Sequence, residues 1–307
     1  MKALVSVVIP VFNGTAYLEA TVNSILAQDY HHIEILLIND GSKDDSAQLI
    51  NTLAEKYCVI KGFHKKNSGV ASARNFGIEV ASGEFIAFCD QDDHWLPNKL
   101  IKQIPLFRNP NVGLVYCGAI AEYSHLNKQD KPDFDDKYRG EVFDRLVHVN
   151  MFSCCTVIAR KSLLRETQAF DEERNLMGAD DWLAWLKLAL VCEFDFIPEH
   201  LAVHVFHGEN FSLNEEKMHL AELVCLDKIA PMAEKYHKSV NWNEIKQNLH
   251  VRYANGYIYS GMFNLAGNTL LTASKLKNNR QLSLKGKLLK IVPNFIWQFM
   301  QKTKRVI

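Results

Sequence analysis

Long apolar runs are missing from this chain of 307 residues. None approaches the ~20 consecutive apolar residues of a membrane-spanning helix, which argues against an integral membrane protein. The first apolar stretch ends at Pro10 and lacks both the length and the small-residue cleavage site of a signal peptide. We therefore expect this stretch to form a strand.

A net charge is also missing, because 35 basic residues balance 35 acidic ones. This balance gives no electrostatic footprint for nucleic acid, so we expect no nucleic-acid partner. It hides an asymmetry, since no acidic residue follows Glu244. An acidic body therefore precedes a basic C-terminal part. The basic residues of 251–307 are Arg252, Lys275, Lys277, Arg280, Lys285, Lys287, Lys290, Lys302, Lys304 and Arg305.

The cysteines give no sign of disulfide pairing. Their number, seven, is odd, they show no Cys-x-x-Cys spacing, and most of them lie in apolar runs. This pattern predicts reduced core thiols in a cytoplasmic protein. With 48% hydrophobic and 23% charged residues, the composition is that of a soluble globular chain that folds around its own core.

What the sequence does contain is an alternation of short apolar segments with helical patterns. The predicted strands are 4–11, 33–38, 59–63 and 85–89, and the predicted helices are 17–26, 46–56 and 70–80. This order predicts a doubly wound α/β layer, whose ligands bind at the carboxyl ends of the strands. The turn after the first strand reads Pro-Val-Phe-Asn-Gly instead of Gly-x-Gly-x-x-Gly, which argues against a dinucleotide-dependent oxidoreductase.

Beyond residue 97 the pattern is looser. We expect a helix at 99–107, a loop at 127–137 and a helix at 180–191, with mainly helices from residue 214 onward. Further strands are predicted at 113–123, 152–159 and 193–197. The chain is thus expected to consist of three parts, with the bounds 1–105, 106–213 and 214–307.

Acidic residues follow the fourth predicted strand. Asp90 and Asp92 stand two positions apart on an extended segment, so their carboxylates point the same way. Two oxygen ligands with open positions suit Mg²⁺ or Mn²⁺ that also binds substrate phosphates. The alternative is a solvated acidic turn without a metal.

Two more polar residues are expected near that edge. Asp40 directly follows the second strand, where it could accept a hydrogen bond from a pyrimidine N–H, although it could equally cap the next helix. Arg74 follows a run of small residues and could contact a phosphate or a base, or be an ordinary surface arginine.

Four motifs, VSVVIPVFNG, LLINDGSKDDS, NSGVASARNFGI and GEFIAFCDQDDHWLPNKL, occur in this order within residues 4–100. Together they resemble glycosyltransferase family 2, the inverting nucleotide-sugar enzymes of GT-A fold, and a weaker match continues to about residue 213. The resemblance implies an α/β GT-A fold with a doubly wound mixed sheet, here followed by a mainly helical C-terminal extension. One departure is Asn39, where the family often has a second Asp.

The resemblance also implies site residues. Residues 1–105 would bind the nucleotide sugar and 106–213 would bind the acceptor and supply the base, with 214–307 as a basic helical extension. Asp90 and Asp92 would form the metal-binding DxD motif, with Mg²⁺ or Mn²⁺ as cofactor. The residues assigned to the donor are Pro10, Val11, Phe12, Asn13, Asp40, Arg74, Asp90 and Gln91.

Inversion at an anomeric carbon needs a base that removes the proton of the acceptor hydroxyl. The segment GADDWLAWLK at residues 178–187 resembles the family's base motif, and it aligns Asp181 with the base. Asp180, Trp182 and Trp185 are then expected at the acceptor site. The alternative is that both aspartates only favour a helix N-terminus and that the tryptophans belong to the core.

Farther along, His207 begins a segment that resembles the family's His-x-x-Asn-x-Ser motif. It would lie over the pyrophosphate and could add a metal ligand, whereas the alternative is a surface histidine in a capped loop. His94, Cys154 and Cys155 have no metal-ligand spacing and are expected to be structural.

The basic C-terminal part contains an amphipathic pattern. Leu288, Ile291, Val292, Phe295 and Phe299 share one helical stripe, and Lys287, Lys290, Asn294, Gln298 and Lys302 lie on the other side. Such a pattern predicts peripheral contact of 285–305 with an anionic membrane. A helix packed on the domain or on a second copy is the alternative, and Pro293 interrupts the pattern.

We therefore predict a glycosyltransferase that moves a sugar from a nucleotide-sugar donor to a hydroxyl of a glycan or lipid-linked glycan in bacterial surface polysaccharide synthesis. UDP is the first choice of nucleotide, and dTDP stays open. The predicted location is the cytoplasm, with contact at the inner face of the membrane. The rival functions are a sugar nucleotidyltransferase and a noncatalytic nucleotide- or sugar-binding protein.

Overall fold

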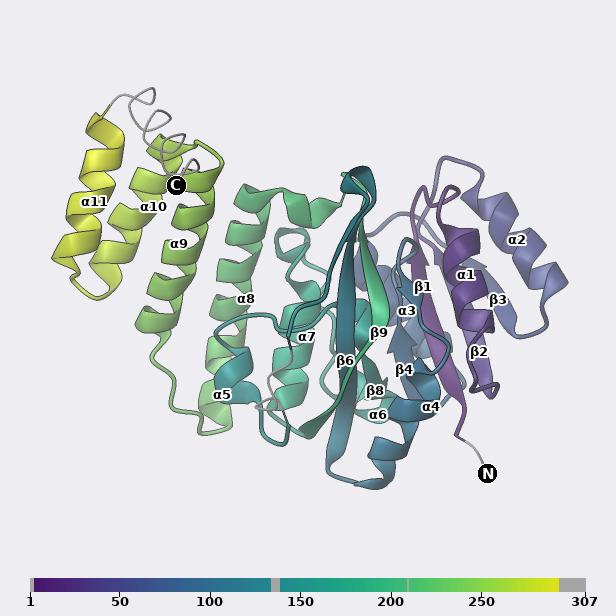
Figure 1. The fold of residues 1–307 in the computed structure, drawn as a ribbon. Helices are drawn as coiled ribbons and strands as arrows, with labels where there is room; N and C mark the ends of the chain where they lie inside the picture. Colours follow the sequence, from purple (N-terminus) through teal and green to yellow (C-terminus); the bar gives the residue numbers. More distant parts are fainter. Residues whose placement is uncertain (1–2, 134–138, 209, 293–307) are drawn as a thin grey trace. The chain divides into compact units, whose positions relative to one another are not determined.

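The computed structural model describes residues 3–133, 139–208 and 210–292. The chain divides into two compact units, Met1–Asn210 and Phe211–Ile307. The first unit holds the sheet with its helices, and the second consists of helices (Figure 1).

A mixed sheet forms the centre of the first unit. Its strands follow the order β3-β2-β1-β4-β8-β6-β9-β5, and β7 pairs with β6. Strands β1 to β4 run parallel, β8 runs antiparallel to both of its neighbours, and β6 and β9 are parallel. This arrangement confirms the predicted mixed α/β sheet. The strand bounds are β1 Val5–Val11, β2 Ile33–Asn39, β3 Ile60–His64, β4 Phe85–Phe88, β5 His94–Trp95, β6 Val112–Tyr123, β7 Lys128–Asp130, β8 Ile158–Arg160 and β9 Glu193–Phe206.

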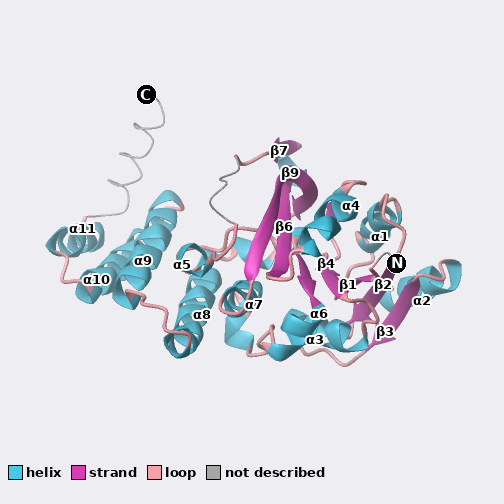
Figure 2. Ribbon diagram, turned by 90° about the horizontal axis from the view of Figure 1, so that it is seen from below, coloured by secondary structure: helices cyan, strands magenta, loops and turns pink. Residues whose placement is uncertain are grey.

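Helices cover both faces of this sheet. Figure 2 shows α1 and α4 on one face of the strands and α3 and α6 on the other. Every residue of β1 and β2 is buried, which explains why these strands read as continuous apolar runs without alternation. The helix bounds are α1 Leu18–Leu26, α2 Ser46–Lys56, α3 Val70–Val80, α4 Lys99–Gln103, α5 Phe143–Leu146, α6 Lys161–Glu166 and α7 Asp180–Ala189.

Three expectations for the middle of the chain differ from the structure. The predicted helix at 99–107 is α4 followed by a 3₁₀ segment, Ile104–Arg108. The predicted strand at 152–159 is a 3₁₀ turn, Cys154–Thr156, followed by the short strand β8. The predicted loop at 127–137 contains β7, and residues 134–138 lie outside the described residues.

Strand β9 is longer than predicted because it crosses a proline. It pairs with β6 up to Ile197 opposite Cys117 and resumes with His200 opposite Gly118, so Pro198 and Glu199 form an irregularity in the ladder. Proline cannot donate a ladder hydrogen bond and is tolerated at such a bulge. Beyond this irregularity the strand continues to Phe206. His204 in the strand and His207 just after it contact the acidic loop described below.

In the described part of the second unit, residues 211–292, four helices form a row: α8 Glu215–Lys235, α9 Trp242–Tyr259, α10 Phe263–Leu276 and α11 Arg280–Ile291. The side chains of Asn214, Asn241 and Asn279 cap the starts of α8, α9 and α11. Gly267 of α10 and Gly286 of α11 let their backbones approach so closely that a Cβ at Gly286 would lie 2.8 Å from the Gly267 carbonyl oxygen. Among the described residues, no helix is both long enough and apolar enough to cross a membrane.

Candidate active site

A buried arginine joins the two acidic motifs of the first unit. Arg74 of α3 donates from Nη2 to Asp90 Oδ1 and from Nη1 to Asp180 Oδ2, each over 2.7 Å. Its side chain and that of Asp180 are almost fully buried, whereas Asp90 is about one third exposed. The loop after β4 and the first turn of α7 therefore meet at one place, although Arg74 and Asp180 are 106 positions apart.

This contact shows that Arg74 is not an ordinary surface arginine, and its contact with the nucleotide stays a prediction. The guanidinium is buried and bonded to two carboxylates. It balances the charge of Asp90 and Asp180, which would otherwise repel each other, and fixes their positions.

Asp181 lies beside that ion pair and stays partly exposed. Its Oδ1 accepts hydrogen bonds from Asn150 Nδ2 at 3.2 Å and from the Trp182 backbone N–H at 2.6 Å. Burial of the carboxyl, reinforced by repulsion from Asp180 and opposed by Arg74, raises the pKa of Asp181 to about 7. A carboxylate with this pKa is suited to take up a proton near neutral pH.

The second aspartate of the DxD motif contacts a histidine from the end of β9. Asp92 Oδ2 lies 2.8 Å from His207 Nε2. The ring of Tyr17, at the start of α1, stacks on the imidazole with a centroid distance of 4.7 Å and an interplanar angle of 16°. Burial, followed by repulsion from Asp93 and Asp90, raises the pKa of Asp92.

These residues fit a divalent cation. A carboxylate oxygen and an imidazole nitrogen that already lie close together are common ligands of Mn²⁺ and Mg²⁺ sites that leave positions for phosphate oxygens. A cation would also relieve the repulsion among Asp90, Asp92 and Asp93 that raises the Asp92 pKa. Asp90, which pairs with Arg74, would contribute its remaining lone pairs.

Another possible ligand group lies next to this loop, where ligand atoms of Asp93, Cys155 and His204 are within 4.8 Å of one another. Although burial opposes the charged imidazole, Asp93 raises the pKa of His204 to about 9. Burial raises the pKa of the Cys155 thiol well above its ordinary value. In the structure, His204 Nδ1 lies 3.1 Å from Asp93 Oδ1, so these two residues form a hydrogen-bonded ion pair.

Asp93 ties the acidic loop to β9. Besides His204 Nδ1, its Oδ1 accepts the backbone N–H of Val205 at 3.0 Å. The pair lies at the point where β9 leads to His207, and so it holds that histidine near Asp92.

Gln91, the middle residue of the DxD motif, closes a small ring with the end of β1. Its Oε1 accepts the Phe12 N–H at 2.9 Å, and its Nε2 donates to the Phe12 carbonyl at 3.1 Å. A Cβ at Gly14 would lie 2.2 Å from Gln91 Oε1, so a larger residue at this position would displace the Gln91 side chain from this ring. Gln91 thus positions the β1 loop, while the Phe12 side chain remains 45% exposed.

The other residues predicted for the donor differ in accessibility. Pro10 and Val11 are buried in β1. Asn13 is exposed, has a left-handed backbone (φ 52°), and accepts the Lys43 N–H with its side chain at 2.8 Å. Among these residues, Phe12 and Asn13 therefore offer side-chain surface to a ligand.

Asp40 is buried and its carboxylate is already engaged. Oδ1 accepts from Lys65 Nζ at 2.6 Å, Oδ2 accepts from the Gly69 N–H at 2.8 Å, and the Ser68 N–H is shared between the two oxygens. The expected direct contact with a base is at odds with this arrangement, because the base would first have to displace Lys65. Asp40 instead joins the end of β2 to the loop before α3.

The two tryptophans predicted at the acceptor site lie in the core. Trp182 is buried and donates from Nε1 to the Leu146 carbonyl at 2.8 Å. Trp185 is fully buried and packs near Phe88 and Phe170. The expectation that they wall an acceptor site is wrong, because α7 is buried on almost all sides and turns both indoles inward.

Sequence reasoning missed Tyr17, Lys65 and His204. Lys65 directly follows β3, which is parallel to β2. Because ligands bind at the carboxyl ends of parallel strands, this position could have predicted that Lys65 lies near Asp40. Tyr17 and His204 reach the site only through the packing of α1 and β9, which no local pattern indicates.

A cavity of about 220 Å³ adjoins the ion-pair network. It is lined by residues 67–71 at the start of α3, by residues 171–174, and by Met177 and Asp180. Asp180 thus borders open space next to the residue that carries the raised pKa.

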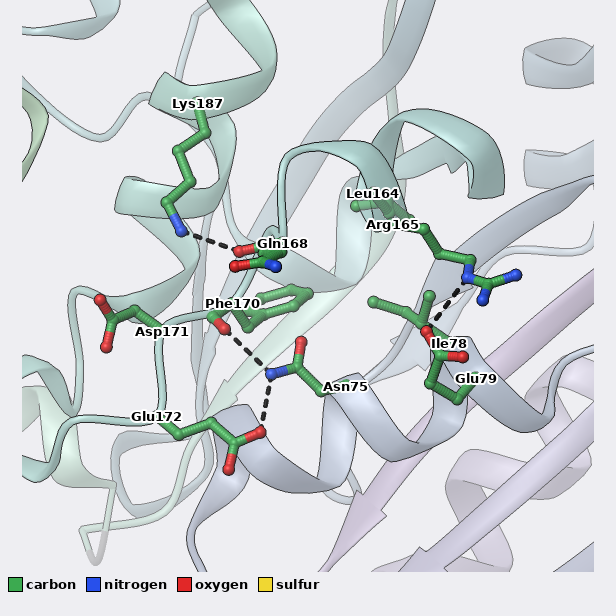
Figure 3. Close-up of a pocket in the computed structure, with 10 residues that line it drawn as sticks. All are labelled: Asn75, Ile78, Glu79, Leu164, Arg165, Gln168, Phe170, Asp171, Glu172 and Lys187. Carbon is green, nitrogen blue, oxygen red and sulfur yellow. Dashed lines mark hydrogen bonds and ion pairs between the residues drawn. The ribbon is translucent and has the colours of Figure 1, made fainter. Parts of the chain in front are cut away.

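A larger pocket, about 440 Å³, lies among α3, α6 and α7 (Figure 3). There Asn75 Nδ2 donates to the Phe170 carbonyl and to Glu172 Oε1, and Lys187 Nζ donates to the Gln168 carbonyl. Asp90, Asp92 and Asp181 do not line this pocket, so it is separate from the carboxylate site.

The sequence matches a known protein family. The sequence profile of Glycosyl transferase family 2 matches residues 6–167, more than half of the chain. The chain belongs to this family. It is therefore a glycosyltransferase, as the sequence predicted, and the rival functions of nucleotidyltransferase and noncatalytic binding protein are set aside.

Two relatives illustrate the similarity within the family. The uncharacterised glycosyltransferase RT0329 of Rickettsia typhi (strain ATCC VR-144 / Wilmington) is 35% identical over 224 residues, covering 69% of this chain and 68% of that protein. TuaG of Bacillus subtilis (strain 168), a glycosyltransferase named for teichuronic acid biosynthesis, is 31% identical over 192 residues, covering 61% of this chain and 72% of that protein.

Solved structures show the same fold. S. aureus TarS 1–349 in complex with UDP-GlcNAc matches with a TM-score of 0.67 at 16% identity, covering 99% of this chain and 92% of that chain. The Pyrobaculum calidifontis mannosyltransferase PcManGT, in complex with GDP-Man and Mn²⁺, matches with a TM-score of 0.60 at 17% identity, covering 94% of this chain and 85% of that chain. The predicted GT-A fold is confirmed.

Proposed function

We propose that this glycosyltransferase moves a sugar from a nucleotide-sugar donor to an acceptor hydroxyl with inversion at the anomeric carbon. The supporting observation is the bridge through Arg74, which brings Asp90 of the DxD motif and the Asp180-Asp181 pair to one place. Direct displacement requires a donor-side and a base-side carboxylate close together, and Asp180 of this group also borders the cavity of about 220 Å³.

Asp181 is proposed as the general base. Its raised pKa leaves it able to take the proton from the acceptor hydroxyl as that oxygen attacks the anomeric carbon. The nucleoside diphosphate departs from the opposite face of the sugar, so the product carries the inverted configuration. In this scheme residues 1–105 bind the donor, 106–213 supply the base and bind the acceptor, and 214–307 form the basic extension.

Asp92 and His207, with Asp90, are proposed to hold Mg²⁺ or Mn²⁺. When bound, the cation would supply positive charge to the departing pyrophosphate. Tyr17 orients the His207 ring by stacking, and Asp93 holds the loop through His204 and Val205. The complex of PcManGT with GDP-Man and Mn²⁺ supports a divalent cation for the fold.

A UDP-sugar is our first proposal for the donor, with a dTDP-sugar as the alternative. The UDP-GlcNAc complex of TarS supports the first choice. The exposed Phe12 ring is a suitable contact for a nucleobase, and Lys65 beside Asp40 could meet a base carbonyl.

For the acceptor we propose a hydroxyl of a glycan or lipid-linked glycan in a bacterial surface polysaccharide, such as a capsule or a lipopolysaccharide. The relative named for teichuronic acid biosynthesis supports this class. We further propose that the enzyme works in the cytoplasm at the inner face of the membrane. The odd number of cysteines, mostly in apolar runs, supports a reducing compartment.

The test begins with a thermal-shift screen of UDP-, dTDP- and GDP-sugars with Mn²⁺, because a ligand that binds the native state raises its melting temperature. Release of nucleoside diphosphate from the selected donor is then compared between the wild type and Asp181→Asn. We expect a loss of about 10²–10⁴-fold in the variant.

Asp144→Asn is the matched control, since Asp144 is an exposed aspartate of the same unit. It should leave turnover unchanged. Equal release by Asp181→Asn and the wild type would contradict the proposed base, and NMR of the product anomer would contradict inversion if the configuration were retained.

A further inference from the structure

Helix α11 is apolar on two opposite sides. One side packs against α10, where Gly286 and Leu289 are buried. This contact explains why one side of α11 is apolar. It does not explain the second apolar side.

The second side is exposed to solvent. Leu284 is 61% exposed, Leu288 46% and Ile291 77%. With 3.6 residues per turn, positions 284, 288 and 291 fall on one stripe, on the side of α11 away from Gly286 and Leu289. In Figures 1 and 2, α11 lies at the outer end of the helical row α8 to α11.

Basic residues flank this stripe. At 100° per residue, Lys287 falls next to the stripe on one side and Lys285 on the other, and both are exposed. No acidic residue occurs in α11, or anywhere after Glu244. The surface therefore combines an apolar centre with positive edges, and α11 itself carries no carboxylate.

We propose that the Leu284–Leu288–Ile291 stripe of α11 docks on an anionic lipid membrane. The apolar side chains enter the boundary between headgroups and acyl chains, while Lys285 and Lys287 contact lipid phosphates. An anionic bilayer matches both features at once, because it offers an apolar interior beneath negative charge. The surface belongs to the second unit, and the proposal does not depend on the transfer reaction.

The test is flotation of the full-length protein with vesicles of phosphatidylcholine alone or with about a quarter phosphatidylglycerol. We expect flotation with the anionic vesicles at low salt and little with the neutral ones. Lys285→Gln/Lys287→Gln should weaken binding about fivefold per lysine at low salt, and the difference should shrink at high salt. Leu284→Gln/Leu288→Gln/Ile291→Gln should weaken binding at least about tenfold at either salt concentration.

Leu126→Gln and Leu220→Gln are matched controls, because these leucines are 61% and 63% exposed on other elements. Both should float like the wild type, and circular dichroism should show unchanged helix content in every variant. Flotation requires no substrate, so its outcome is separate from that of the transferase assays.

Three outcomes would overturn the proposal. The first is a wild type that does not float with anionic vesicles. The second is a triple variant that floats normally while a chain ended at Val292 does not, which would assign binding to residues 293–307. The third is a concentration-dependent dimer in sedimentation that the triple variant abolishes without any effect on flotation, which would assign the stripe to a second copy.

Discussion

The Arg74 ion-pair network of the first unit and helix α11 of the second unit use charged side chains in opposite ways. In Met1–Asn210, Arg74, Asp93 and Asp180 are buried and bonded to one another or to neighbouring strands. In Phe211–Ile307, Lys285 and Lys287 are exposed beside apolar side chains. Buried pairs fix positions to fractions of an ångström, as displacement chemistry needs, whereas an exposed basic surface suits association with an extended partner.

Two histidines with shifted pKa values, His204 and His219, sharpen this comparison. His204 of the first unit faces Asp93, and its pKa is raised to about 9. His219 of the second unit lies 2.9 Å from His250, and burial together with repulsion from His250 and Arg252 lowers its pKa to about 4. The same side chain is thus charged in one unit and neutral in the other at neutral pH, because one has a carboxylate partner and the other has not.

The largest effect is expected from replacing Arg74, the buried arginine that pairs with both Asp90 and Asp180. Arg74→Met leaves Asp90 and Asp180 close together without their shared partner. We expect the free energy of unfolding to fall by about 3–5 kcal/mol, with loss of donor turnover. Urea titration measures the first and nucleotide release the second.

Arg165→Met is the matched control, because Arg165 pairs with Glu79 on the surface, where both side chains are more than half exposed. Its cost should stay below about 1 kcal/mol. Equal costs for the two variants would show that burial does not distinguish these ion pairs.

Most of the local structure could be predicted because it depends on local patterns. The apolar runs of β1 and β2 and the helical spacing of α2 and α3 gave these elements within one residue of their bounds. The GT-A fold was predicted from the resemblance of four motifs, in their order along the chain, to glycosyltransferase family 2.

The contacts within the site were harder to predict because they depend on distant partners. Asp93 and His204 are 111 positions apart and meet only because β9 passes Pro198 and pairs with β5. The burial of Trp182 and Trp185 depends on how α7 is enclosed, which the alternation of apolar residues does not encode. Sequence patterns thus predicted the carboxylates of the candidate site, but they did not predict the side chains that contact them.

The two histidines should give opposite pH dependences of stability. Because the folded-state pKa of His204 lies above the ordinary value of 6.5, its contribution is fully present below about pH 6.5 and is lost as the pH rises through about 9. The folded-state pKa of His219 is lowered, so its contribution is present above about pH 6.5 and is lost as the pH falls through about 4. Each contribution is at most ~3 kcal/mol.

Unfolding free energies measured across pH check this contrast. His204→Gln should flatten the alkaline side of the profile and His219→Gln the acidic side. If His204→Gln changed only the acidic side, the ion pair with Asp93 would not be the source of the effect.

A smaller effect is expected in the pH dependence of catalysis, where kcat/KM should change about tenfold per pH unit. With a pKa of about 7, Asp181 becomes protonated below neutrality, so kcat/KM should fall with decreasing pH below about 7. Asp180→Asn removes a repelling charge and should move this fall to lower pH. The profile is measured at saturating Mn²⁺, and an unchanged position in Asp180→Asn would contradict the coupling between the two aspartates.

The smallest effect concerns the second unit alone. Gly286→Ala gains helix propensity but places a methyl group against the Gly267 backbone of α10, which cannot yield as a flexible side chain could. We expect a net loss of about 1–2 kcal/mol, with faster amide hydrogen exchange in α10 and α11 and none of this change in α3. Gln281→Ala, at an exposed position of the same helix, should not accelerate exchange. Faster exchange in α3 of the Gly286→Ala variant would mean that the units unfold together, so that a change in the basic helices would also disturb the buried ion pairs.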